Sequence, residues 1–157
     1  VVYVQLGAGR INSIENVIEN VLTSLYSYPE VYVVLGESML GERLSFTHER
    51  LRVIRDYPNA MYANAFDASI QAGGYNSYQE MRTFGIPTLF IPNTDTGMDD
   101  QVARCRTSEK EGWGIVNRSI TMEDLKKDIG TLFQIKPALK SDQSNGAEDV
   151  VSLLLNS

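Results

Sequence analysis

The stretch ASIQAGGYNSYQEMRTFGIPTLFIP, residues 68–92, decides the fold that we expect for this chain. An apolar run at 68–72 ends in Gly73-Gly74, a helical stretch of about 75–84 follows, and a second apolar run occupies 88–91. This order is typical of a strand, a glycine turn, a helix and a parallel strand. Because parallel strands end at the same edge of a sheet, the glycine turn and the polar loop after Pro92 should lie together. Such an edge suits a phosphate-bearing ligand.

The rest of the chain continues the alternation of strands and helices. Further strands are expected at 1–6, 31–35, 51–54 and 114–116. A helix capped by Ser13 is expected to run to Leu25, and a short helix is expected within 57–66. Two more helices are expected, one from Met98 to Glu111 that ends at Gly112, and one from the cap Thr121 to about Phe133. Most strands are continuous apolar runs, which indicates burial on both faces. We therefore predict an α/β, Rossmann-like three-layer α/β/α fold with about six mainly parallel strands.

The domain prediction divides the chain at residue 137. Residues 1–136 form the ligand-binding domain, and 137–157 form a linker and an apolar C-terminal helix. Since the chain begins at Val1, inside an apolar run and without a starting methionine, we expect a fragment that lacks an N-terminal part. The last helix would dock either on this domain or on that missing N-terminal domain.

Composition narrows the classes of function. The chain has 157 residues, 43% of them hydrophobic and 22% charged, as expected for one soluble globular domain. A net charge of −6 argues against nucleic acid as a partner. One cysteine and one histidine argue against a metal site, and we expect no metal and no cofactor. No membrane-spanning run or signal peptide is visible, so a cytoplasmic location is expected.

A first glycine turn, Gly7-Ala8-Gly9-Arg10, follows the first strand. Two glycines allow close approach of the backbone to a phosphate, and Arg10 adds a cation. The dinucleotide fingerprint requires a third glycine where this chain has Asn12, which disfavours a nicotinamide or flavin site. A purely structural turn remains an open alternative.

The second glycine turn carries a fuller constellation. Asn76 and Ser77 fall in the first helical turn, where side chains and unpaired N–H groups can bind phosphate oxygens. Glu80 follows Gly74 by six residues, and its two oxygens suit a pair of vicinal hydroxyls. The alternative is that Glu80 is an ordinary charge on a helix surface.

Residues 72–92 resemble the signature of the C-terminal, donor-binding domain of GT-B glycosyltransferases of the family 28 type. The similar group includes the bacterial GlcNAc transferase that acts on a lipid-linked intermediate of peptidoglycan. The pattern is carried by Gly73, Gly74, Ser77, Glu80, Gly85, Pro87 and Pro92, and then by Asp99-Asp100-Gln101. The first turn departs from the richer glycine loop of the family.

The resemblance implies a site for a UDP-sugar, with a hexose or N-acetylhexosamine as the transferred group. Glu80 would hold the ribose, and Gly73, Gly74, Asn76 and Ser77 the diphosphate. The first turn, with Gly7, Gly9 and Arg10, would also face the phosphates. The base would lie near 55–58, where Tyr57 could stack on it, and Asp100 and Gln101 would contact the donor sugar.

The resemblance also implies what this chain lacks. The acceptor site and the general base would belong to the missing N-terminal domain or a partner subunit, so we nominate no catalytic residue here and expect the isolated chain to be inactive. The pathway would concern cell-envelope polysaccharide, with an approach to the inner face of the membrane through the missing part. Alternatives are a UDP-sugar hydrolase or epimerase of the same architecture, and a separate donor-binding subunit of a two-chain transferase.

Overall fold

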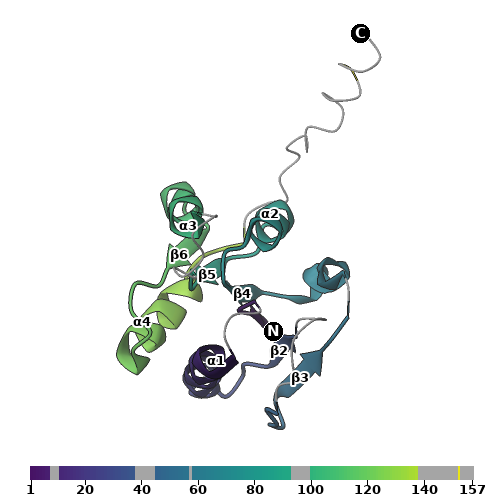
Figure 1. Cartoon of the computed structure of the whole chain (residues 1–157), viewed down its shortest axis with the longest axis vertical. Coiled ribbons are helices and arrows are strands. Elements are labelled where there is room, and N and C mark those ends of the chain that lie inside the picture. Colours follow the sequence, from purple (N-terminus) through teal and green to yellow (C-terminus); the bar gives the residue numbers. More distant parts are fainter. Residues whose placement is uncertain (8–10, 38–44, 57, 93–99, 138–151, 153–157) are drawn as a thin grey trace.

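The computed structural model describes residues 1–7, 11–37, 45–56, 58–92, 100–137 and 152. Its centre is one six-stranded, all-parallel sheet in the order β3-β2-β1-β4-β5-β6 (Figure 1). The strands are β1 Val2–Gln5, β2 Val33–Gly36, β3 Leu51–Ile54, β4 Ala68–Gln71, β5 Thr88–Phe90 and β6 Gly114–Val116. This confirms the predicted fold class and the parallel sheet.

Helices cover both faces of the sheet, as Figure 1 shows. One layer holds α1 Ile11–Tyr26 and α4 Met122–Leu132, which pack against each other. The other holds the 3₁₀ helix η1 Asn59–Ala65, α2 Tyr75–Phe84 and α3 Gln101–Glu111. Side chains alternate along each strand, so each layer receives its own half of the sheet residues.

Two hydrophobic clusters fill the spaces between the layers. The larger joins α1 and α4 to strand residues such as Val4, Ile70 and Leu89. The smaller joins Tyr78 and Met81 of α2 to Phe90 and Trp113. It is supplemented by polar residues on the same face of the sheet, where the buried hydroxyls of Ser69 and Thr88 are 2.7 Å apart. The face of the sheet that the α2 layer covers is thus partly polar.

Two predicted helix starts are wrong. Ser13 is not a cap, because α1 begins at Ile11 and Ser13 lies inside it. The helix predicted from Met98 begins at Gln101, because Asp100 has non-helical dihedrals and its carboxylate accepts the N–H of Ala103 at 2.9 Å. The stop at Gly112 is confirmed by its left-handed conformation, and the Thr121 cap by its bond to the N–H of Asp124. The predicted linker and final helix fall almost wholly outside the described residues.

Candidate functional site

The strand order reverses between β1 and β4, which are neighbours at the centre of the sheet. A glycine follows each of these strands, and both have positive φ, +79° at Gly7 and +81° at Gly73. A Cβ placed on Gly7 would be 3.9 Å from the Cβ of Ala72, so the two turns adjoin. In open α/β sheets, this carboxyl edge at the reversal is where ligands bind.

Gly73 is tightly enclosed from two sides. A Cβ at this position would overlap the buried sulfur of Cys105 in α3. Its carbonyl accepts a hydrogen bond of 2.9 Å from Nη1 of Arg104. The Arg104 guanidinium also lies over the ring of Tyr75, 5.4 Å from the ring centroid. Because Tyr75 is the first residue of α2, the structure holds a cation beside that helix start.

Gly74 has the opposite surroundings and is the N-cap of α2. Among the residues that the structure describes, a Cβ there would meet nothing within 4 Å, and no side chain caps the helix. The first turn of α2 contains no acidic residue, whereas Asp100 and Thr121 cap α3 and α4. The first N–H groups of a helix have no acceptor within the helix, and its positive end attracts anions. Asn76 is exposed and Ser77 half-buried in this same turn.

Glu80 is a half-buried carboxylate on α2. Within the described part of the chain it has no hydrogen bond and no ion pair. Burial raises its pKa, because removing water disfavours the charged form. A carboxylate in such surroundings gains free energy from any ligand that brings it hydroxyl donors.

Tyr3 of β1 lies close to Glu80. Its hydroxyl donates to Oε1 of Gln5 at 3.0 Å and accepts from Nδ2 of Asn59 at 2.9 Å. Burial raises the pKa of Tyr3 to about 12; the Asn59 hydrogen bond opposes this shift, and the negative charge of Glu80 adds to it. The ring stacks on Phe66, with centroids 4.6 Å apart. The buried phenol therefore joins β1 and η1, within reach of the charge of Glu80.

Sequence reasoning did not single out Tyr3 or Asn59. Tyr3 is one residue of an apolar strand, and Asn59 follows a proline at a helix start, where asparagine is common. Their contact joins positions 56 residues apart, and no local pattern carries it.

Of the other predicted site residues, Gly9, Arg10 and Tyr57 lie outside the described residues. Asp100 is exposed, and one of its oxygens caps α3. Gln101 is half-buried and opens α3, one helical turn before Arg104, which reaches Gly73. The start of α3 and the second glycine turn are thus neighbours.

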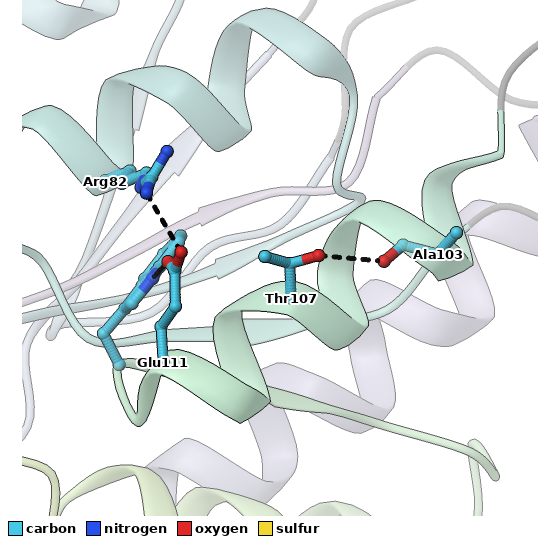
Figure 2. Close-up of polar contacts among 5 residues, drawn as sticks. Arg82, Ala103, Thr107 and Glu111 are labelled. Carbon is cyan, nitrogen blue, oxygen red and sulfur yellow. Dashed lines mark hydrogen bonds and ion pairs between the residues drawn. The ribbon is translucent and has the colours of Figure 1, made fainter.

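The far ends of α2 and α3 are also joined, as Figure 2 shows. Nη2 of Arg82 is 3.0 Å from Oε1 of Glu111, and Trp113 donates its indole N–H to Oε2 of the same carboxylate at 2.8 Å. Thr107 donates to the carbonyl of Ala103 at 3.4 Å along α3 (Figure 2). A surface ion pair contributes about 0–1 kcal/mol, so the Arg82–Glu111 pair adds little to the stability of the fold.

The described residues contain no cluster of three or more histidine, cysteine, aspartate or glutamate side chains arranged to hold a metal ion. In the same part of the chain, no helix has the length and hydrophobicity to cross a membrane.

The known proteins that resemble this chain in sequence or in fold include several glycosyltransferases. No family model matches the chain. A protein of Methanosarcina acetivorans named as an uncharacterized glycosyltransferase is 29% identical in an alignment of 106 residues, which covers 64% of this chain and 27% of that protein. This chain therefore spans about a quarter of the length of that relative.

Alignments with solved structures cover a larger share of this chain. MurG of Acinetobacter baumannii aligns with a TM-score of 0.72 and 18% identity, covering 99% of this chain and 49% of MurG. The spinosyn rhamnosyltransferase SpnG, complexed with thymidine diphosphate, aligns with a TM-score of 0.66 and 20% identity, covering 83% of this chain and 36% of SpnG. The chain thus has the Rossmann-like α/β fold found within these GT-B-like structures, and its sequence is similar to a glycosyltransferase.

Proposed function

We propose that this chain binds the UDP moiety of a nucleotide sugar, as the donor-binding part of a glycosyltransferase. The observation that carries the proposal is Glu80, a half-buried carboxylate with raised pKa and no donor among the described residues. It lies six residues beyond the uncapped start of α2, about 9 Å along the helix axis. A ribose 5′-diphosphate can bridge these two places.

The diphosphate would lie against the start of α2. There the N–H groups of the first turn, the open space at Gly74 and the side chains of Asn76 and Ser77 favour an anion. Arg104, fixed by the Gly73 carbonyl and the Tyr75 ring, adds positive charge. In sugar transfer the bond between the anomeric carbon and the phosphate oxygen breaks, and the electron pair stays on the diphosphate. A positive field at this place stabilises that leaving group.

The ribose would lie at Glu80, with its two hydroxyls donating to the carboxylate. The donor sugar would lie beyond the diphosphate, toward Asp100 and Gln101 at the start of α3. SpnG is complexed with thymidine diphosphate, a related nucleoside diphosphate. The acceptor and the general base would come from the remainder of a longer protein, since the chain spans less than half of the solved chains that it matches.

The proposal is tested by titrating UDP into the 157-residue chain in a calorimeter. We expect one site per chain, and Glu80→Gln should weaken binding at least about tenfold, as loss of a charged hydrogen-bond partner does. Glu123→Gln, an exposed glutamate on α4 in the opposite layer, is the matched control and should bind UDP like the unsubstituted chain. Absence of binding by a folded sample would refute the proposal.

A further inference from the structure

A second hydrogen-bond acceptor without a donor lies near Glu80. The Oδ1 atom of Asn59 is buried and has no hydrogen-bond partner in the described part of the chain. The Tyr3 hydroxyl donates its proton to Gln5, so its oxygen can only accept a hydrogen bond from Asn59. The Asn59 amide therefore points Nδ2 at Tyr3, and its Oδ1 is left without a donor. Buried polar atoms are nearly always paired, so an unpaired one calls for a cause such as a missing ligand.

The position of Asn59 connects it with Glu80 rather than with the glycine turns. Its amide contacts the same Tyr3 hydroxyl whose pKa the charge of Glu80 raises. Their elements, η1 and α2, also contact each other. In Figure 1, η1 is the unlabelled coil between α2 and the β3 end of the sheet. Asn59 as a whole is only half-buried, so this end of η1 borders solvent.

We infer that Asn59 is a specificity residue for the nucleobase, and that it selects a base whose ring nitrogen carries a proton. This inference rests on the proposed function. With the ribose hydroxyls at Glu80 and the phosphates at the start of α2, the base is the part of the nucleotide that can bring one more donor to Asn59. Uracil and thymine have an N–H at N3, which Oδ1 can accept.

The same chemistry predicts which base is rejected. Cytosine has a lone pair at N3, which would face the lone pairs of Oδ1 and leave the buried acceptor unpaired. Sites built around a buried polar partner discriminate strongly against ligands that lack the matching group. UDP and CDP are therefore the sharpest pair of probes, because they share ribose and diphosphate and differ only at this edge of the base.

The experiment measures the affinities of UDP and CDP for the 157-residue chain and for two variants. We expect the unsubstituted chain to favour UDP about tenfold or more. Asn59→Leu keeps the approximate volume but removes the amide, and should bring the ratio of the two affinities near one. Tyr3→Phe removes the hydroxyl that orients Asn59 but keeps Oδ1 and the ring that stacks on Phe66. Since the freed amide can also turn Nδ2 toward N3 of cytosine, this variant should show a smaller preference for UDP than the unsubstituted chain and a larger one than Asn59→Leu.

The possible results separate the two proposals. Equal affinities for UDP and CDP in the unsubstituted chain would overturn the specificity role and leave nucleotide binding intact. An unchanged preference in Asn59→Leu would also overturn it, because Asn59 would then only support Tyr3. Failure of both nucleotides to bind a folded sample would overturn the proposed function itself. A thermal melt checks folding, and Asn59→Ala replaces the leucine variant if that variant does not fold.

Discussion

Gly73 and Gly74 are neighbours in one turn, but alanine at each should have opposite effects. Gly73 has φ +81°, and a Cβ there would overlap the sulfur of Cys105. Gly74 has φ −56° and ψ 151°, which any residue adopts, and a Cβ there would meet open space. Gly73→Ala should therefore destabilise the fold, whereas Gly74→Ala should leave it stable and obstruct the ligand.

The size of the first effect follows from two contributions. Left-handed dihedrals cost a residue with a Cβ about 1–2 kcal/mol. Overfilling a packed site costs about 1–3 kcal/mol, and here Cys105 is fully buried and held within α3. Together they give about 2–5 kcal/mol, which lowers Tm on the order of 10 °C for a domain of this size. Gly74→Ala should change Tm by a few degrees at most.

Thermal denaturation followed by circular dichroism measures both variants, and UDP titration gives their affinities. The double variant Gly73→Ala/Cys105→Ala removes the sulfur that would overlap the new Cβ. Adding Gly73→Ala to Cys105→Ala should therefore lower Tm by less than adding Gly73→Ala to the unsubstituted chain. An unchanged Tm for Gly73→Ala would refute the reasoning about the turn. An unchanged UDP affinity for Gly74→Ala would refute the position given to the diphosphate.

Three further predictions concern single side chains. Because burial raises the pKa of Glu80, the charge of this carboxylate opposes folding once pH rises through that pKa. Glu80→Gln should therefore raise Tm at neutral pH but not in acid, as thermal melts across pH would show. An equal Tm difference at all pH values would contradict this. Arg104→Met should weaken the binding of UDP about tenfold and the binding of uridine little in parallel titrations, since only UDP has the phosphates. Equal losses of affinity for the two ligands would argue for a structural role of Arg104 alone. Asp100→Ala should cost about 1 kcal/mol in urea unfolding through the lost cap, whereas Asp100→Asn, which also caps well, should cost little; equal losses would show that the cap is unimportant.

Local sequence signals predicted the elements around the second glycine turn. Glycines flank α2 at Gly74 and Gly85, and its bounds agree with the expected 75–84. Continuous apolar runs predicted the parallel strands because burial on both faces demands them. The starts of α1 and α3 were misjudged, since several residues there could cap a helix and only the backbone dihedrals decide which one does.

The surroundings of the candidate site were less accessible to sequence reasoning. The spacing of Glu80 from Gly74 suggested a ligand, but the absence of a donor depends on which elements pack around α2. The bond between Tyr3 and Asn59 depends on β1 and η1 meeting in the folded chain. The enclosure of Gly73 by Cys105 and Arg104 similarly depends on the packing of α3. Such long-range contacts leave no periodic pattern in the sequence.

The most direct test of the account compares UDP with 2′-deoxy-UDP in the unsubstituted chain and in Glu80→Gln. If Glu80 holds both ribose hydroxyls, the unsubstituted chain should favour UDP by about tenfold or more, and the variant should bind the two ligands with nearly equal, weaker affinity. The same preference in both proteins would mean that Glu80 does not read the ribose, and would contradict the central claim.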